Sequence, residues 1–339
     1  MISIIIPIFN EIHYLETFVT NLKDSFKNEE VEYIFVNDGS TDGSKEWIDN
    51  YIKKQDQQKN IFIDIKNNSG KGNAIHQGLN LSKGDYILFQ DSDLELDSKD
   101  SLEMYKIIKN DNNIQCIFGS RYLSGKLKRN NNFINEFIGR INSLIFNILF
   151  FQSISDVHCG TKIITKNLKN KIHLKIKDFG FEIDLATQIA KNNIDIFEYG
   201  ISYFARSVKE GKKITWIDGI KSYYYLFKTR FIDNELSTSL SIFFSFFYMV
   251  FIGSYFGMGI GKTLMIIFSG IIGLFIGIHR KIISSSMIFI FIFLGSLFSK
   301  GNGKIYTVIL GFIIGLYISK QISKIFNKKY KNRFIKFIF

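Results

Sequence analysis

The amino-acid sequence changes character at about residue 236, and this change limits the possible folds more than any other feature. Charged residues are scattered through the chain before that point, whereas residues 236–278 contain a single formal charge, Lys262. A transmembrane helix needs about 20 predominantly apolar residues, so this stretch is long enough for two. Residues 282–299 and 305–319 are further apolar segments. Because these segments lack the polar stripe of a soluble helix, we expect a membrane domain at 236–322, with about four transmembrane helices in two hairpins.

Basic residues between and after these segments predict their orientation. Arg280 and Lys281 lie between the second and third segments, and seven Lys and Arg residues follow the fourth, at positions 320–336. The opposite loops hold three basic residues. Cytoplasmic loops carry the excess of Lys and Arg in membrane proteins. We therefore expect an integral membrane protein with the N-terminal domain and both termini in the cytoplasm, and with 323–339 as a basic cytoplasmic tail.

The net charge of +12 raises the question of a nucleic-acid partner. The basic cluster directly follows an apolar segment, which is typical of a segment that faces anionic lipid headgroups. No recognised nucleic-acid-binding motif accompanies the charge. We therefore expect a lipid bilayer as a partner and no nucleic acid. The sequence leaves open assembly into a homo-oligomer.

Before residue 231, short apolar runs alternate with helical patterns. This alternation is typical of an α/β domain with a mainly parallel sheet, in which ligands bind at the carboxyl ends of the strands. The first expected strand is bounded by Pro7. Expected strands are residues 2–6, 33–36, 61–65 and 86–89, and expected helices are 11–27, 44–52 and 71–81.

Residues 133–151 form a different kind of predicted helix. Glu136, Arg140, Ser143 and Asn147 share one face, and Ile and Phe residues cover much of the rest. Such an amphipathic helix lies either in a membrane interface or against a protein core. The sequence leaves both alternatives open.

An acidic pair, Asp91 and Asp93, follows the last apolar strand. Two unit charges about 4 Å apart repel by roughly 4 kcal/mol at an effective dielectric of about 20, so acids clustered at a strand end favour a bound cation. Hard carboxylate oxygens suit Mg²⁺ or Mn²⁺. We therefore expect a metal site at Asp91 and Asp93, with one of these two ions as cofactor.

Several motifs around this pair together resemble one known family. Residues 4–11 (IIIPIFNE), 35–44 (FVNDGSTDGS), 84–94 (GDYILFQDSDL) and 119–122 (GSRY) have the order and spacing of family-2 glycosyltransferases. Within that family the chain resembles the dolichyl- and polyprenyl-phosphate sugar transferases of the dolichol-phosphate mannose synthase type, over about residues 2–231. The resemblance implies a GT-A fold, a Rossmann-like α/β domain with a mainly parallel sheet, as a catalytic domain at residues 1–231.

The resemblance also implies roles for residues at the strand ends. Those expected to hold the nucleoside are Pro7, Phe9, Glu11 and Asp38. Asp91 and Asp93 would bridge the metal to the diphosphate, and Glu95 is a further candidate metal ligand. The Gly70-Lys71-Gly72 stretch lacks the full Walker A pattern. It either brings Lys71 to a nucleotide phosphate or is a plain helix start.

Cationic side chains are candidates for binding a lipid phosphate. Arg121, Arg140 and Arg206 fall where the related enzymes place basic residues, and a guanidinium binds phosphate through two N–H groups. We expect all three to bind phosphate, and Arg121 and Arg206 to take part in catalysis together with the acidic pair. Lys212 and Lys213 either close over the phosphates or belong to a solvated loop.

No side chain is expected to act as an obligatory base, because a phosphate monoester, with a second pKa near about 6, is already anionic near pH 7. Asp156 and Glu182 are expected to orient the arginines. His76 and His158 are expected to have structural roles.

The predicted reaction is an inverting, metal-dependent transfer of a hexose from a nucleoside-diphosphate sugar, GDP-mannose or UDP-glucose, to polyprenyl (dolichyl or undecaprenyl) phosphate at the cytoplasmic membrane face. One alternative is a membrane glycosyltransferase that extends a lipid-linked glycan or polysaccharide. Processive members of that kind usually carry a Gln-x-x-Arg-Trp motif, which this sequence lacks. The other alternative is a non-catalytic membrane scaffold, and the intact Asp91/Asp93 pair argues against it.

Overall fold

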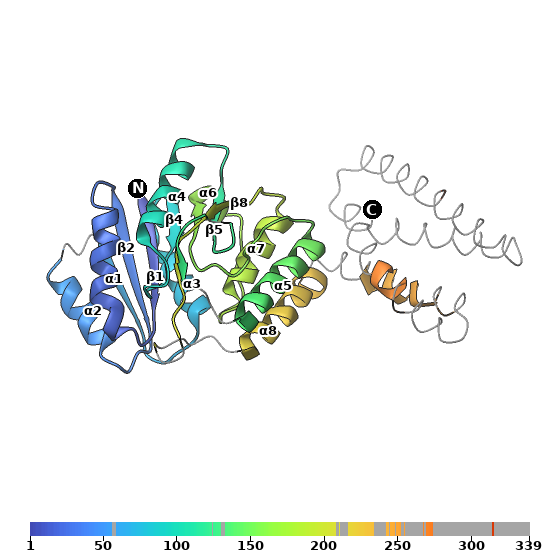
Figure 1. Cartoon of the computed structure of the whole chain (residues 1–339), viewed down its shortest axis with the longest axis horizontal. Helices are drawn as coiled ribbons and strands as arrows, with labels where there is room; N and C mark the ends of the chain where they lie inside the picture. The colour runs from blue at the N-terminus through green and yellow to red at the C-terminus, as the bar shows by residue number, and fades with distance from the viewer. Residues whose placement is uncertain are drawn as a thin grey trace, which may run out of the picture. The chain divides into compact units, whose positions relative to one another are not determined.

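The computed structural model describes residues 1–55, 59–123, 125–129, 133–207, 210 and 216–233, with isolated positions between 242 and 314. The chain divides into two compact units, Met1–Leu226 and Phe227–Phe339 (Figure 1). In the described part of the second unit, a short π-helix, Lys228–Ile232, follows Phe227. The expected transmembrane helices at 236–322, the basic tail at 323–339 and the lysines Lys212 and Lys213 lie wholly or mostly outside the described residues. They stay predictions.

A seven-stranded sheet forms the centre of the first unit, in the order β3-β2-β1-β4-β7-β5-β8. Its strands are β1 Ile2–Ile8, β2 Val31–Asp38, β3 Asn60–Ile65, β4 Tyr86–Phe89, β5 Cys116–Ser120, β7 Lys162–Thr165 and β8 Phe197–Gly200. β7 runs antiparallel to both of its neighbours, β4 and β5, and the other pairs are parallel. A small second sheet pairs β6 (Lys128–Arg129) with β9 (Tyr203–Phe204). The predicted α/β class with a mainly parallel sheet is confirmed.

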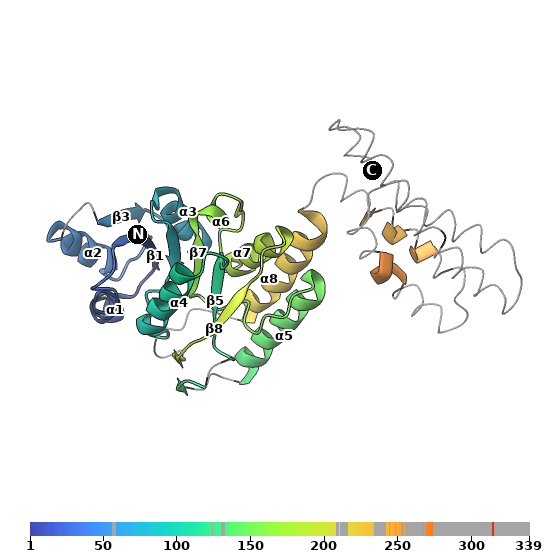
Figure 2. The same cartoon turned by 90° about the horizontal axis from the view of Figure 1, so that it is seen from above.

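Helices cover both faces of this sheet and make a three-layer domain (Figures 1 and 2). Successive side chains along a strand point to opposite faces of the sheet. Ile4 and Ile6 therefore belong to one hydrophobic core, and Ile5 belongs to the other. The helices of the first core are α1 Ile12–Ser25, α2 Ser44–Lys53 and α4 Ser98–Asn110. Those of the second core are α3 Lys71–Leu81, α5 Phe133–Phe150, α6 Lys166–Lys169, α7 Phe181–Lys191 and α8 Trp216–Phe227.

The expectation that Pro7 bounds the first strand is wrong, because β1 continues to Ile8 and Pro7 pairs in register with Val36. On its other side, β1 pairs with β4 only as far as Ile5. Beyond Ile5 the strand is therefore bonded along one edge, where a residue without an N–H is tolerated. This extension carries the chain past β4 into the edge of the sheet where ligands bind.

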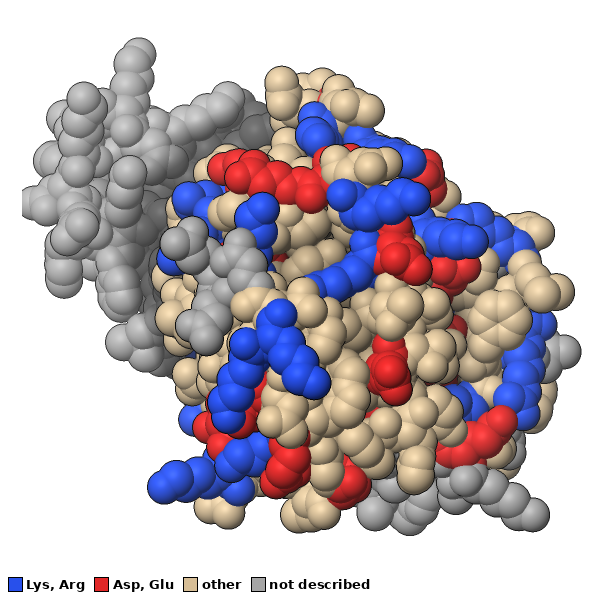
Figure 3. Space-filling view, turned by 90° about the vertical axis from the view of Figure 1, so that its left-hand side faces the viewer, with Lys and Arg blue, Asp and Glu red and all other residues tan. Residues whose placement is uncertain are grey.

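Charged side chains of both signs share the surface of the first unit. On the face shown in Figure 3, Lys and Arg side chains lie among Asp and Glu side chains. Ion pairs such as Lys45–Asp64 and Lys53–Asp49 join some of these surface charges. Exposed pairs of this kind contribute little to stability, about 0–1 kcal/mol each, so the fold depends mainly on the two apolar cores.

One glycine allows α3 to pack closely on the sheet, and this contact generates a test of the fold. A methyl group added at Gly78 would lie 2.5 Å from Cγ2 of Ile5. We expect Gly78→Ala to overpack the core and to cost about 1–3 kcal/mol, although alanine is the better helix former. Thermal unfolding of the detergent-solubilised full chain should then start several degrees lower. Gly125→Ala is the matched control, since nothing lies within 4 Å of its added methyl group. An unfolding temperature of Gly78→Ala at or above that of the control would contradict this packing.

Candidate active site

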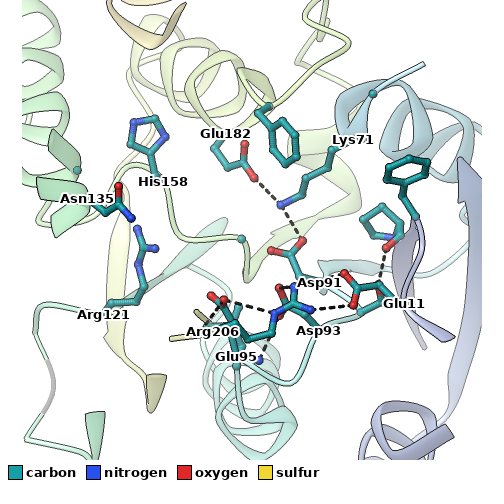
Figure 4. Close-up of a pocket in the computed structure, with 18 of the residues that line it drawn as sticks. Glu11, Lys71, Asp91, Asp93, Glu95, Arg121, Asn135, His158, Glu182 and Arg206 are labelled. Atoms are coloured by element: carbon teal, nitrogen blue, oxygen red, sulfur yellow. Dashed lines mark hydrogen bonds and ion pairs between the residues drawn. The ribbon is translucent and has the colours of Figure 1, made fainter. Parts of the chain in front are cut away.

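A cavity of about 450 Å³ opens at the carboxyl ends of the central strands. Its walls come from the ends of β1 and β2 and the residues after β1 and β4 on one side and from α5 on the other, with the N-terminal ends of α3 and α7 between them (Figure 4). The acidic side chains that line it are Glu11, Asp38, Asp91, Asp93, Glu95 and Glu182, and the basic ones are Lys71, Arg121 and Arg206. The lining therefore carries more carboxylates than cations. Such a site favours binding of a further cation.

Lys71 links Asp91 to α7. Its Nζ lies 2.6 Å from Oδ1 of Asp91 and 2.6 Å from Oε1 of Glu182. Burial alone would lower the pKa of Lys71, but the charges of Asp91 and Glu182 outweigh it and hold that pKa above its usual value. The ammonium therefore stays charged and offsets two of the carboxylates.

Arg206 offsets the charge of the other acidic side chains. Its Nη1 lies 2.9 Å from Glu11, its Nη2 lies 2.9 Å from Asp93, and its Nε lies 3.5 Å from Oε1 of Glu95. Its backbone N–H also donates to Glu95 over 2.9 Å. Burial acts to lower the pKa of Arg206, but the hydrogen bonds and charges of these acids raise it. One guanidinium thus joins the ends of β1 and β4.

The two cations do not fully compensate the acids. Burial, followed by the charges of Asp91 and Glu95, raises the pKa of Asp93 to about 7. Among the described residues, no three Asp, Glu, His or Cys side chains are already arranged to hold a metal ion. The reason is that Asp91 and Asp93 turn oxygens toward Lys71 and Arg206. Carboxylate oxygens are nevertheless suitable ligands for Mg²⁺ or Mn²⁺. Either ion would compete with these two side chains for the same oxygens.

Asp38 lines the cavity and also fixes the loop before α3. Its Oδ1 accepts hydrogen bonds from the N–H and the hydroxyl of Ser69, and its Oδ2 accepts one from the N–H of Gly70. Gly70 has a φ of 97°, and a methyl group there would lie 2.6 Å from the carbonyl oxygen of Lys177. This close approach requires glycine. The loop sets the direction in which α3 begins, and hence the position of Lys71.

Arg121 follows β5 and is held by Asp156. Its Nε and Nη2 donate to the two oxygens of that carboxylate over 2.7 and 2.8 Å. Burial would raise the pKa of Asp156, but the Arg121 charge and hydrogen bonds lower it below its usual value. The pair is bidentate and buried, so Arg121 is an oriented rather than a mobile cation.

Most of the predicted site residues meet in this one cavity. Those that line it are Pro7, Phe9, Glu11, Asp38, Lys71, Asp91, Asp93, Glu95, Arg121 and Arg206. Arg140 is not among the lining residues: its guanidinium pairs with Glu136 of its own helix and lies 4.3 Å from the ring centroid of Tyr122. Lys212 and Lys213 lie outside the described residues.

The sequence interpretation missed lining residues on α5 and in the loop before β7. Asn135, Gly139 and Asn142 recur on α5 at spacings of four and three and line the cavity together with Ile138. That spacing was the available signal. His158, expected to be structural, also lines the cavity. Its position depends on the antiparallel strand β7, which no local pattern predicts.

Comparison with known proteins agrees with this geometry. The sequence matches the model of the family described as Glycosyl transferase family 2 over residues 3–172. It is 28% identical over 215 residues to a dolichyl-phosphate beta-glucosyltransferase of Dictyostelium discoideum, which covers 60% of this chain and 66% of that protein. It is 30% identical over 125 residues to a poly-beta-1,6-N-acetyl-D-glucosamine synthase of Staphylococcus aureus, which covers 37% of this chain and 29% of that one. The chain thus spans less than two thirds of the length of either relative.

The fold is shared with a solved enzyme. A crystal structure of glucosyl-3-phosphoglycerate synthase from Mycobacterium tuberculosis in complex with Mn²⁺, uridine diphosphate and glucosyl-3-phosphoglycerate matches with a TM-score of 0.52 and 16% sequence identity. The match covers 69% of this chain and 81% of that one. The likeness establishes the GT-A type of α/β fold. With the family match over half of the chain, it follows that this protein belongs to glycosyl transferase family 2 and is a glycosyltransferase.

The charge balance of the acid cluster can be tested with Arg206→Met. A unit charge about 5 Å away contributes roughly 3 kcal/mol at an effective dielectric of about 20. Removing the guanidinium should therefore let the nucleotide-free protein bind Mn²⁺ about tenfold more tightly or better, as measured by the EPR signal of free Mn²⁺. The control is Arg129→Met, whose guanidinium pairs with Glu210 instead and which should bind Mn²⁺ like the unmodified protein. Equal or weaker binding by Arg206→Met would count against this cluster as the cation site.

Proposed function

We propose that the protein transfers glucose, with inversion, from UDP-glucose to a polyprenyl phosphate at the cytoplasmic face of a membrane. The observation that carries this proposal is the pair of walls around the cavity. One wall holds the acid cluster at Asp91 and Asp93. The other is α5, whose opposite side is apolar and exposed. A charged donor and an acceptor with an apolar tail thus have suitable surfaces at one site.

The relatives support the choice of substrates. The Dictyostelium protein is named for glucosyl transfer to dolichyl phosphate, and solved structures of similar fold contain uridine diphosphate with Mn²⁺ and a phosphate-bearing acceptor. UDP-glucose is therefore the first donor to test, and GDP-mannose is the second. Extension of a lipid-linked glycan is the competing activity, because the staphylococcal synthase matches 125 residues of the chain.

The charged side chains of the cavity account for the chemistry. A phosphate acceptor needs no proton removed by the enzyme near pH 7, since its second pKa is about 6. Positioning and charge compensation then lower the barrier. Lys71 and Arg206 lie where they can exchange carboxylate partners for the oxygens of the donor diphosphate, and Arg121, fixed by Asp156, can orient the acceptor. A divalent cation held by Asp91 and Asp93 would offset the charge that develops on the departing diphosphate.

Helix α5 supports a position at the membrane surface. Phe133, Phe137, Leu144 and Ile148 are 79%, 52%, 57% and 55% exposed. Within the described part of the chain, Phe133–Phe150 is the one helix long and apolar enough to cross a membrane by length and composition. Since another face of α5 lines the cavity, the helix fits an interfacial position better than a spanning one. Arg140, stacked on Tyr122, is exposed on the same helix and suits lipid phosphates. The bias of basic residues around 236–336 supports the cytoplasmic side.

The transfer itself can be tested with membranes that contain the full chain. Polyprenyl phosphate and radiolabelled UDP-glucose should give an organic-extractable product that mild acid cleaves. Asp91→Asn or Asp93→Asn should lower this transfer by about a hundredfold or more, because a carboxylate that would hold the charge-balancing divalent cation is lost. Asp85→Asn is the control, since Asp85 is exposed and pairs with the N-terminal amine. Full activity of the two acidic-pair variants would remove their assigned role.

The product also separates the two candidate activities. If neither UDP-glucose nor GDP-mannose gives a mild-acid-labile lipid, but label enters a longer glycan, the protein extends glycans and the proposal is wrong.

The position of α5 can be tested by fluorescence. The chain has two cysteines, and both are buried, so a cysteine added at Phe137 can be labelled selectively with an environment-sensitive dye. In nanodiscs of zwitterionic lipid and in nanodiscs of anionic lipid, the emission of the dye should indicate an apolar environment. Lipids with brominated acyl chains should quench this emission. The same dye at Glu103→Cys, on exposed α4 surface, should not be quenched. Equal behaviour at the two positions would contradict an interfacial α5.

A further inference from the structure

The α5 wall of the cavity carries a buried amide without a full set of partners. Asn142 is 1% exposed and lines the cavity. Its Nδ2 lies 2.9 Å from Nε2 of His158, and its Oδ1 has no hydrogen-bond partner among the described residues. A buried polar atom left unpaired costs about 1–3 kcal/mol. A ligand that enters the cavity and forms a hydrogen bond with this atom would remove that cost.

His158 is the hydrogen-bond partner of Asn142. Its backbone N–H donates to Oδ1 of Asp156 over 3.2 Å, which ties the histidine to the loop that positions Arg121. Burial lowers the pKa of His158 to about 4, so the imidazole is neutral near pH 7 and offers one donor and one acceptor. Figure 4 shows His158 and Asn135 across the cavity from Asp91.

The chemistry of the pair selects a hydroxyl group. The contact with His158 suits two orientations of the Asn142 amide, and each leaves one end of that amide, an acceptor or a donor, without a protein partner. A hydroxyl both donates and accepts, so it satisfies either orientation. A phosphate dianion only accepts, so it satisfies one orientation of the amide and not the other, and the neutral imidazole adds no positive charge to attract it.

We propose that Asn142 and His158 recognise hydroxyl groups of the sugar ring carried by the donor. This inference rests on the proposed function. A diphosphate at Asp91 and Asp93 places the attached sugar in the space between the acid cluster and α5. The pair then determines which sugar is accepted, because a hydroxyl of the wrong configuration leaves the buried amide unpaired.

Binding of matched ligands isolates the sugar contact. The full chain in detergent with Mn²⁺ is titrated with UDP and UDP-glucose, and in parallel with GDP and GDP-mannose. Asn142→Leu keeps the side-chain volume but removes the amide. It should weaken binding of the sugar nucleotide by about tenfold and leave binding of the free nucleotide within about twofold, which also shows that the variant folds. His158→Phe, which keeps a ring without nitrogens, carries the same expectation if Asn142→Leu does not fold.

A control variant on the same helix distinguishes recognition of the sugar from a structural role in the protein. Ser143 is buried but does not line the cavity; its hydroxyl accepts a hydrogen bond from the N–H of Val157, in the loop that holds His158. Ser143→Ala should therefore leave the ratio of the two affinities unchanged. A selective loss in Asn142→Leu or His158→Phe, together with altered preference between UDP-glucose and UDP-galactose, supports the inference.

Two results would overturn the inference. One is an unchanged ratio of the two affinities in both cavity variants, whether neither affinity changes or both fall equally. The other is a raised KM for polyprenyl phosphate with unchanged donor affinity, which would assign the pair to the acceptor. These results leave transfer by the unmodified protein intact. If that protein instead binds no sugar nucleotide and transfers nothing, the proposed function itself fails and the inference with it.

Discussion

The repulsion among carboxylates at one edge of the sheet is the constraint on which the rest of the site depends. Asp91 and Asp93 follow β4, and Glu11 follows β1, so the topology itself brings these acids together. Lys71 and Arg206 make the arrangement tolerable by placing a cation between them. The same charges that offset the acids in the free protein are those that a bound diphosphate and a divalent cation would rearrange.

Much of the fold could be predicted because it follows from local patterns. α3 at Lys71–Leu81 and β4 at Tyr86–Phe89 have the bounds expected from apolar spacing and turn residues. Asp91 and Asp93 were found from their place after the last apolar strand, whereas Pro7, Phe9 and Glu11 came from the family resemblance. The partners of the cavity's cations were predicted only in part: Asp156 orients Arg121 as expected, whereas Glu182, expected to orient an arginine, meets Lys71 across 111 positions of sequence. His158 and Asn142 were missed because their contact needs the antiparallel strand β7 and the packing of α5.

Helix α5 connects the chemistry of the cavity with the proposed membrane surface. Asn135, Gly139 and Asn142 face the cavity, whereas Phe133 and Phe137 are exposed. The sequence left two alternatives for this helix, core packing or an interface, and its two faces combine features of both. An acceptor with an ionic head and an apolar tail matches such a helix, because each part finds a surface of its own polarity.

The central claim is that the sugar is joined to a lipid phosphate with inversion, and NMR of the isolated product tests it most directly. UDP-glucose labelled with carbon-13 at the anomeric carbon is incubated with polyprenyl phosphate and membranes that contain the full chain. The account predicts a single β-configured anomeric carbon coupled to phosphorus. An anomeric carbon without phosphorus coupling, or one that keeps the α configuration of the donor, would contradict it.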